Sequence, residues 1–365
     1  MAGRVTDRLG VAIVGCGNIA DRYAADLVRQ RHLRLVGVTD IDRERARQFA
    51  ESVGTRAYDS LDETLADDDV AIVANLTSHD AHVPVSTAAI EAGRHVFSEK
   101  PMALSAADAQ ELVALAGRRG VLLGSAPIVG LGELAQTARR WVAEGRLGAV
   151  RLAWADVNWG RIEAWHPSPA GFYAVGPLYD VGVYPLTLLT GLFGPVRRVT
   201  ADHRRVLVER RTRSGEPFTV EAPDYVVASL ELAGGPMVRL TANFYVADPA
   251  RQRGIELHGD DGSLWLSNWF QFAGNLEHAP LGEPYRPVPL LRDPQVELPW
   301  AAGLEDLAVA AMESRAPAAG GEHAAHVVDV IETILRSGDE GRALTVDSSF
   351  APSPPPAWAE TVDLR

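Results

Sequence analysis

The sequence predicts an α/β protein of two domains, and three observations support this prediction. The chain has 365 residues, of which 47% are hydrophobic, and this length suits about two domains of usual size. Short apolar runs alternate with helical segments over residues 1–125. Longer strands with hairpin-type breaks follow from about residue 150. We therefore expect a parallel sheet with helices on both faces, followed by a mostly antiparallel α+β domain.

The elements of the first half can be placed in order. Strands are predicted at residues 11–15, 33–39, 70–75, 95–98 and 121–124, because these runs are short, apolar and bounded by turn residues. Helices are predicted between them at residues 18–31, 43–52, 84–92 and 106–118. Ser105 directly precedes the last of these helices and is expected to cap it, with Asp108 in its first turn.

The second half begins with a helix predicted from residue 131 to about 145. Strands follow at residues 150–157, 196–209, 225–232, 237–246 and 255–258, and a late helix at 324–336. Residues 351–357 are too rich in proline for either element and are expected to be extended. The predicted domains are therefore 1–125 and 126–350, followed by a proline-rich tail at 351–365.

Composition narrows the class of function. The net charge is −13, with 48 acidic and 35 basic side chains, so a nucleic-acid partner is not expected. The single cysteine, Cys16, allows no intramolecular disulfide and no zinc cluster. The N-terminus has no long apolar core and no run of 18 apolar residues occurs, so we expect a cytoplasmic enzyme without a membrane partner.

A glycine loop follows the first predicted strand and opens a helix. Residues 15–20 read GCGNIA, which is the G-x-G-x-x-A pattern of dinucleotide binding. The first glycine permits a tight turn, the second lets the backbone approach a pyrophosphate, and the small third residue lets the helix pack closely. The pyrophosphate would lie at the helix N-terminus. The predicted cofactor-binding residues of this loop are Gly15, Gly17, Asn18, Ile19 and Ala20.

An acidic residue ends the second predicted strand. Asp40 lies 20 residues after Ala20, where a carboxylate accepts hydrogen bonds from ribose hydroxyls. It would also repel a 2′-phosphate, and Asp42 adds further negative charge. NAD is therefore the predicted cofactor. Arg43 partly offsets this charge, so NADP is the alternative.

The fourth strand runs into Glu99, Lys100 and Pro101. Ligands of such sheets bind outside the carboxyl ends of the strands. Lys100 at this place can reach a substrate hydroxyl or the cofactor ribose, and its charge can stabilise an alkoxide that develops during oxidation. Glu99 can orient the lysine or bind a ribose. A solvated salt bridge explains the same residues equally well. We expect Pro101 to fix the chain after Lys100 through a cis peptide bond.

A second group of polar residues opens a helix-like stretch at residues 176–186. Asp180 and Tyr184 are four residues apart and would share one helix face. Gly182 between them is expected to leave room for a flat ligand. A lysine near the tyrosine hydroxyl would favour its deprotonated form, which can take a proton from an alcohol. The alternative is a buried Tyr–Asp hydrogen bond that stabilises the helix.

Four segments together resemble a known family. GCGNIA, VTDID, EAGRHVFSEKPMALS and DVGVYPL occur in the order and approximate spacing of the glucose–fructose oxidoreductase / inositol dehydrogenase / rhizopine-catabolism (Gfo/Idh/MocA) oxidoreductases. The resemblance covers roughly residues 9–346. The glycine loop is shared with many folds, whereas the EKP segment and D-x-G-x-Y are more specific.

The resemblance implies a Rossmann domain and a C-terminal domain with a large open sheet, which often carries the oligomer interface. A homodimer or homotetramer through this sheet is therefore expected. Lys100 matches the lysine that contacts substrate and assists proton transfer. Asp180 matches the acid of the D-x-G-x-H/Y motif, and Tyr184 matches its acid/base. No metal is implied.

The chain also departs from the family pattern. Residues 125–130 lack the arginine that many members carry there, and residues 174–177 replace a run of three glycines. The preceding loop contains Trp165 and His166, which we expect to contact the substrate, although simple packing explains the tryptophan equally well. Three residues after the third strand are expected to border the cofactor; they are Thr77, His79 and His82. Capping of the next helix is the alternative for His82.

The predicted function is an NAD-dependent dehydrogenase that acts on a secondary hydroxyl of a sugar, a sugar derivative or a cyclic polyol. One alternative is an NAD-dependent glycoside hydrolase or lyase that oxidises its sugar transiently. Another is a nucleotide- and sugar-binding sensor without catalysis. Retention of the lysine, the aspartate and the tyrosine together argues against the sensor.

Overall fold

A computed structural model describes residues 8–246, 250–294 and 298–361. These residues form two compact units. The first contains residues 8–128 and 298–325, and the second contains the described residues of 129–294 and 326–361. Residues 298–325 thus belong to the first unit, although they lie far along the chain within the range 126–350.

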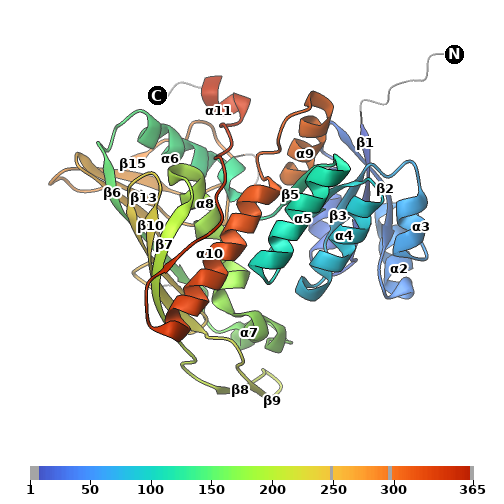
Figure 1. Cartoon of the computed structure of the whole chain (residues 1–365), viewed down its shortest axis with the longest axis horizontal. Coiled ribbons are helices and arrows are strands. Elements are labelled where there is room, and N and C mark those ends of the chain that lie inside the picture. Colours follow the sequence, from blue (N-terminus) through green and yellow to red (C-terminus); the bar gives the residue numbers. More distant parts are fainter. Residues whose placement is uncertain (1–7, 247–249, 295–297, 362–365) are drawn as a thin grey trace. The chain divides into compact units, whose positions relative to one another are not determined.

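The first unit is built on a parallel sheet with the order β2-β1-β3-β4-β5, labelled in Figure 1. Its strands are β1 (Leu9–Val14), β2 (Leu33–Thr39), β3 (Ile72–Asn75), β4 (His95–Ser98) and β5 (Leu123–Ser125). Its helices are α1 (Ala20–Leu27), α2 (Arg43–Val53), α3 (Leu61–Ala66), α4 (His82–Glu91), α5 (Ala106–Arg119) and α9 (Ala302–Glu313). The predicted parallel fold is confirmed. Neither α3 nor α9 was predicted.

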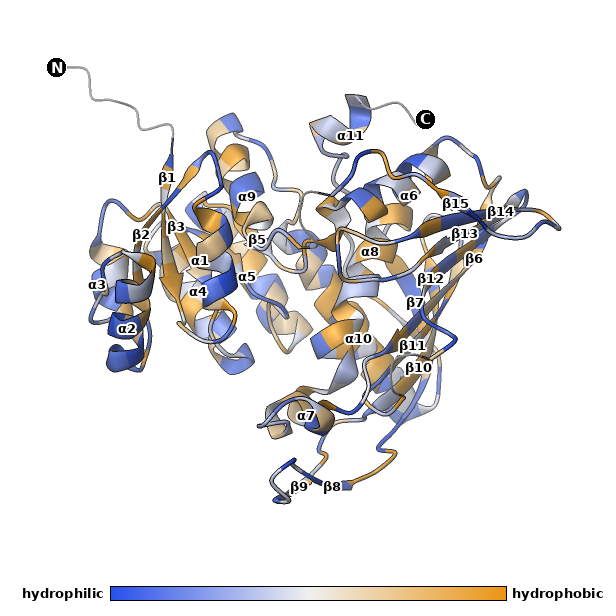
Figure 2. Cartoon of the chain, turned by 180° about the vertical axis from the view of Figure 1, so that it is seen from behind, coloured by the Kyte–Doolittle hydropathy of each residue, from blue (hydrophilic) through white to orange (hydrophobic). Residues whose placement is uncertain are grey.

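Hydrophobic burial explains why these strands lie at the centre of the unit. Every residue of β3 is buried, and so are the last five residues of β1. In Figure 2 these strands are coloured as hydrophobic, whereas α2 is largely hydrophilic. Ser105 caps α5 as predicted, because its hydroxyl accepts a hydrogen bond from Asp108 N at 3.1 Å.

The strands of this sheet end in register. Val14 at the end of β1 is paired with Thr39 of β2 and Asn75 of β3, and Asn75 is paired with Ser98 of β4. The order also reverses at β1, since β2 lies on one side and β3 on the other. Such a reversal is where doubly wound sheets bind ligands, outside the carboxyl ends of the strands.

The second unit contains a nine-stranded sheet with the order β15-β14-β13-β12-β6-β11-β10-β7-β16. Its pairs are antiparallel except for β6 with β11, so the predicted mostly antiparallel sheet is confirmed. The strands are β6 (Val150–Asn158), β7 (Val196–Arg204), β10 (Tyr225–Leu232), β11 (Met237–Asn243), β12 (Gly254–Gly259), β13 (Gly262–Leu266), β14 (Leu276–Pro280), β15 (Arg286–Val288) and β16 (Leu344–Thr345).

One predicted strand of the second unit ends earlier than expected, and the tail, which has no helix or strand at 351–356 as expected, continues into a helix that was not predicted. The strand predicted at 196–209 ends at Arg204, and a separate hairpin of β8 (Glu209–Arg211) and β9 (Pro217–Thr219) follows. The proline-rich segment leads into a short helix, α11 (Ala357–Thr361). The remaining helices are α6 (Glu133–Ala143), α7 (Ala170–Pro177), α8 (Val183–Phe193) and α10 (Gly321–Glu340). Across the part of the chain that the structure describes, no helix has the length and apolar character that a membrane crossing needs.

A buried histidine joins α10 to the sheet. His326 is fully buried, and its Nε2 accepts a hydrogen bond from Val196 N at 2.9 Å. The proton therefore lies on Nδ1, which donates to Ser348 Oγ at 2.9 Å. Burial lowers the pKa of His326 from 6.5 to about 4. The folded state thus requires the neutral imidazole.

Because the pKa of His326 is lowered in the folded state, we expect the protein to lose stability in mild acid. Unfolding releases a group that binds a proton below pH 6.5, whereas the folded protein resists protonation down to about pH 4. The second unit should therefore lose about 2 kcal/mol of unfolding free energy between pH 7 and pH 5. Urea unfolding followed by tryptophan fluorescence measures this, since seven of the eight tryptophans lie in that unit. His326→Gln should flatten the pH dependence; an unchanged slope in this variant would contradict the assignment.

Candidate active site

The glycine loop of the first unit turns where β1 ends. Gly15 has φ +96°, and a Cβ at this position would lie 2.7 Å from the carbonyl oxygen of Leu76. Only glycine fits such a turn without strain. Gly17 faces open space, since a Cβ there would meet no atom within 4 Å. Ala20 is the first residue of α1 and is fully buried, so its small side chain allows the helix to lie close to the sheet.

The carboxylate of Asp40 lies against this loop. Its Oδ2 accepts a hydrogen bond from Cys16 N at 2.7 Å, and its Oδ1 accepts one from Asp42 N at 2.8 Å. The guanidinium of Arg45 lies 3.5 Å from Oδ1. The arginine that contacts Asp40 is therefore Arg45, where the sequence analysis considered Arg43. Its side chain is 53% exposed.

The only cysteine, Cys16, has an unreactive thiol. Cys16 is buried between the glycines of the loop, and its Sγ lies 3.6 Å from the carbonyl oxygen of Thr39. Burial, reinforced by the negative charge of Asp40, raises the pKa of its thiol to about 12. The thiol is thus protonated at neutral pH and is a poor nucleophile.

A buried asparagine organises the chain after β3. The Asn75 amide donates to the carbonyl oxygen of His82 at 2.9 Å and to Ser86 Oγ at 3.0 Å, while its Oδ1 accepts from Thr77 Oγ1 at 2.6 Å. The ring nitrogens of His82 lie 3.1 Å from the carbonyl oxygen of Thr77 and 2.7 Å from that of Pro101. His82 is 1% exposed, so its ring connects the ends of β3 and β4 from within. His79 lies nearby, with its ring 6.1 Å from that of His82.

The segment after β4 is held by its own glutamate. Glu99 Oε1 accepts a hydrogen bond from the Tyr23 hydroxyl at 2.7 Å, and Oε2 accepts one from Lys100 N at 2.9 Å. The peptide bond between Lys100 and Pro101 is cis, as predicted. Both oxygens of Glu99 are therefore engaged in fixing the backbone of Lys100 to α1.

These residues fit a dinucleotide. The ends of the strands bring the glycine loop, Asp40, Thr77 and Glu99 to one edge of the sheet. The backbone at Gly17 is open to a ligand, as a pyrophosphate requires. A carboxylate has about four acceptor positions, so Asp40 retains acceptor capacity for a ribose hydroxyl.

Asp180 and Tyr184 lie in the second unit. Asp180 is buried in a π-helical turn, η4 (Leu178–Gly182), and Tyr184 follows in the first turn of α8. Gly182 does not leave room for a ligand as expected, because a Cβ there would lie 3.1 Å from Leu178 Cδ2. This glycine instead permits close packing within the turn. Lys100 belongs to the first unit, so its cooperation with Tyr184 stays a prediction.

Aromatic rings surround Tyr184 within the second unit. Its ring centroid lies 5.9 Å from that of Trp269 and 6.4 Å from that of Phe270. Trp269 in turn lies 5.7 Å from Trp159, and Trp159 lies 6.2 Å from Trp165. Four of these rings, those of Trp159, Trp165, Trp269 and Phe270, line a cavity of about 400 Å³.

The sequence analysis anticipated only part of this group. Trp165 was expected to contact substrate, and it lines the cavity with 45% of its surface exposed. His166 accepts a hydrogen bond from Ser168 N and packs against Phe172. Trp159 and Trp269 were missed. One signal was available. Trp159 directly follows β6 and Trp269 lies three residues after β13, and ligand-binding loops often begin where strands end.

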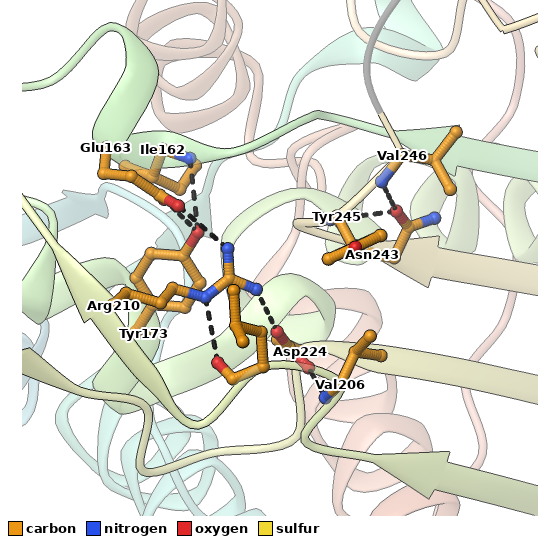
Figure 3. Close-up of polar contacts among 10 residues, drawn as sticks. Ile162, Glu163, Tyr173, Val206, Arg210, Asp224, Asn243, Tyr245 and Val246 are labelled. Carbon is orange, nitrogen blue, oxygen red and sulfur yellow. Dashed lines mark hydrogen bonds and ion pairs between the residues drawn. The ribbon is translucent and has the colours of Figure 1, made fainter.

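A buried ionic cluster supports the loop that carries Trp165, and Figure 3 shows it. Arg210 pairs with Glu163 at 2.9 Å and with Asp224 at 2.5 Å. The Tyr173 hydroxyl donates to Glu163 at 2.5 Å and accepts from Ile162 N at 3.3 Å. Trp165 N donates to the carbonyl oxygen of Ile162, so this cluster anchors the backbone on which the tryptophan lies.

The charges of this cluster compensate one another. Burial disfavours ionisation of Glu163, but hydrogen bonds from Tyr173 and Arg210 outweigh it and hold the pKa of Glu163 below its usual value. Burial and the hydrogen bond to Glu163 raise the pKa of Tyr173. The Arg210 side chain is 1% exposed and that of Asp224 is fully buried. Removal of the arginine would therefore leave two carboxylates without a cation.

Comparison with known proteins matches both parts of the chain to models of protein families. Residues 9–126 match the model described as "Oxidoreductase family, NAD-binding Rossmann fold", and residues 135–265 match the "GFO/IDH/MocA C-terminal domain". A two-domain, NAD-binding oxidoreductase is thereby defined. The chain belongs to the Gfo/Idh/MocA family.

Curated relatives and a solved structure agree with this assignment. The chain is 30% identical to the dTDP-3,4-didehydro-2,6-dideoxy-alpha-D-glucose 3-reductase of Streptomyces violaceoruber, over 71% of this chain and 72% of that protein. It is 27% identical to the 1,5-anhydro-D-fructose reductase of Ensifer adhaerens, over 69% and 74% of the two chains. The aldose-aldose oxidoreductase of Caulobacter crescentus, crystallised with glycerol, superposes with a TM-score of 0.77 at 26% identity, over 93% and 99% of the two chains.

The ionic cluster predicts a large effect of one substitution. Arg210→Met should lower the unfolding free energy of the second unit by about 3–5 kcal/mol, because Glu163 and Asp224 remain buried without their cation. Urea unfolding followed by tryptophan fluorescence measures the loss. Arg211→Met is the matched control, since Arg211 is the exposed neighbour on β8. Equal losses in the two variants would show that the cluster does not support the fold.

Proposed function

We propose that this protein is an NAD-dependent dehydrogenase or reductase acting on a secondary hydroxyl or keto group of a sugar, a sugar derivative or a cyclic polyol. The observation that carries the proposal is the identity of residue 100. Lys100 is the only lysine in the chain, and arginine supplies the other 34 of its 35 basic side chains. This lysine follows β4, at the sheet edge where the cofactor loop also lies.

The preference for lysine at this position has a chemical reason. An ammonium is a compact charge that donates from three directions and can exchange protons, whereas a guanidinium is planar and always protonated. Lys100 would stabilise the negative charge that develops on the substrate oxygen. Tyr184 would take the hydroxyl proton, and Asp180 would position Tyr184 or the substrate. Bound NAD supplies the hydride acceptor at its nicotinamide ring.

The residues of the sheet edge would divide the work of cofactor binding. The loop of Gly15, Gly17, Asn18, Ile19 and Ala20 would hold the pyrophosphate. Asp40 would bind the ribose of the adenosine, while Thr77 and His79 would border the nicotinamide ribose. His82 and Glu99 support the site through the backbone, because their polar atoms already contact Pro101, Thr77, Tyr23 and Lys100.

The outer face of the nine-stranded sheet supports the expected homo-oligomer. Leu152, Trp154 and Met237 are 44%, 39% and 47% exposed, although they are apolar. Met237 is paired with Leu152 across β11 and β6, so these side chains form one continuous patch. Apolar patches of this kind mark protein interfaces. A second copy of the chain is the partner that we propose.

Two other functions use the same residues. An NAD-dependent hydrolase or lyase would regenerate its cofactor in each cycle and accumulate no NADH. A sensor would bind NAD and sugar without any turnover. A panel of sugars and polyols with NAD or NADP, followed at the absorbance of the reduced nicotinamide, separates the three. Stoichiometric NADH supports the dehydrogenase.

The unique lysine allows a sharp test of catalysis. Lys100→Arg keeps a positive charge of the kind that the chain uses elsewhere, and Lys100→Met removes it. Both variants should lose about 10²–10⁴-fold in kcat but retain the thermal stabilisation by NAD. Tyr184→Phe should behave alike, because it lacks the hydroxyl that accepts the proton. Wild-type kcat in Lys100→Arg would show that only the charge matters, and wild-type kcat in Lys100→Met would refute the role of the lysine.

We expect Asp40, which follows β2, to determine the preference for NAD over NADP. Asp40→Ser should raise the KM for NAD about tenfold or more and improve use of NADP, because a repulsive carboxylate beside the 2′-position is removed. Arg45→Ala is the complementary variant and should weaken any use of NADP. The ratio of kcat/KM for the two cofactors measures both effects. An unchanged ratio in Asp40→Ser would place the ribose elsewhere.

A further inference from the structure

The aromatic cavity of the second unit lies beside the proposed catalytic tyrosine. It is about 400 Å³ in volume, within the ~300–1,000 Å³ range of pockets that bury drug-sized ligands. The ring contacts run from Tyr184 to Trp269, then to Trp159 and then to Trp165. A ligand held by these rings would therefore extend from the reacting carbon into the cavity.

The arrangement of the rings favours a flat group. The planes of Trp159 and Trp165 are inclined by 85°, and those of Trp159 and Trp269 by 60°. The rings thus form walls that meet at an angle, with no wall parallel to the next. A planar aromatic group can lie on one face and present its edge to another, which is the preferred geometry of aromatic pairs.

The polar side chains around the cavity are largely engaged by the protein itself. Asn158 donates to the carbonyl oxygen of Gln252 and accepts from Asn243, both at 2.7 Å. Asn268 donates to the carbonyl oxygen of Ala273 and accepts from the amides of Phe270 and Gln271. These contacts fix the loops that carry the aromatic rings, so the pocket is preorganised. They also leave few amide groups for the many hydroxyls of a second sugar.

The charges at the cavity oppose binding of an anion. Among the described residues, the charged side chains that line it are one acid and one base, Asp156 and Arg253. Asp156 also pairs with Arg239 at 2.7 Å, while burial raises its pKa. A phosphate or pyrophosphate needs an excess of cationic donors, which this lining does not offer. The occupant should therefore carry no phosphate or other negative group.

We propose that this cavity is a subsite for an uncharged aromatic group attached to the reacting sugar, so that the preferred substrates are aryl glycosides. The inference rests on the proposed function, since it takes Tyr184 as the group that meets the reacting hydroxyl. Trp269 and Phe270 form the end of the subsite next to that hydroxyl. Trp159 and Trp165 bind the aromatic aglycone.

The test compares matched ligands that differ in the aglycone alone. Phenyl and methyl β-glycosides of glucose, galactose and xylose are titrated against the full-length protein with NAD present, and tryptophan fluorescence reports binding. The phenyl glycoside of at least one sugar should bind about tenfold more tightly than its methyl counterpart. The corresponding disaccharide, which is richer in hydroxyls, should bind no better than the methyl glycoside. Equal binding of phenyl and methyl glycosides, or tighter binding of the disaccharide, would overturn the inference.

Variants assign the preference to this cavity. Trp165→Leu, at an exposed position, and Trp269→Leu, at a buried one, should each reduce the phenyl-to-methyl ratio at least threefold. Trp358→Leu is the control, because Trp358 lies in α11 and packs on Arg292. A ratio that falls equally in the control, or in no cavity variant, would overturn the inference.

Turnover separates this inference from the proposed function. NADH formation from free or methylated sugars without a phenyl preference would refute the subsite alone. A phenyl preference in binding, without NADH formation from any ligand, would refute the dehydrogenase and leave the subsite standing.

Discussion

The register of five parallel strands is the constraint on which the candidate cofactor site depends. Hydrogen bonds between β1, β2, β3 and β4 bring Val14, Thr39, Asn75 and Ser98 to the same level of the sheet. The residues that follow these strands must then emerge along one edge. Gly15, Asp40, Thr77 and Glu99 are far apart in sequence, and this register alone makes them neighbours. A slip between β1 and β2 would separate the glycine loop from its carboxylate.

Buried asparagine side chains hold the loops that follow the strands in fixed positions. Asn75 is fully buried and connects Thr77, His82 and Ser86. Asn243, also fully buried, accepts hydrogen bonds from the backbone amides of Tyr245 and Val246, as Figure 3 shows. Its side-chain amide donates to Asn158 Oδ1. In both units a buried polar side chain satisfies the backbone where a strand gives way to a loop. Such loops hold their side chains in place without needing to be packed inside the core.

The sequence predicted those features that depend on local patterns, and it missed contacts that exist only once the chain has folded. Strands 33–39, 95–98 and 225–232 were predicted to the residue, because their apolar pattern and flanking turns are local signals. The role of Gly182 was misread, since its neighbour Leu178 is visible only once the π-helical turn is formed. The aromatic cavity combines Trp159 and Trp165 from the connection between β6 and α7 with Trp269 from the connection between β13 and β14, and no local pattern joins the two segments. Arg45 was overlooked although it lies only five residues from Asp40, because its side chain reaches the carboxylate only once the first turn of α2 has formed.

The amino-acid composition of the chain supports the proposed role of Lys100 independently of the sequence motif. The chain uses arginine at 34 of its 35 basic positions, both on its surface and in the buried ion pair with Asp224. The one exception stands where Glu99 fixes the backbone and His82 holds the following proline. A solvated salt bridge would be served equally by arginine and gives no reason for this exception. The role that we propose does give one, because a compact ammonium can approach the substrate oxygen more closely than a planar guanidinium and can donate to it from three directions.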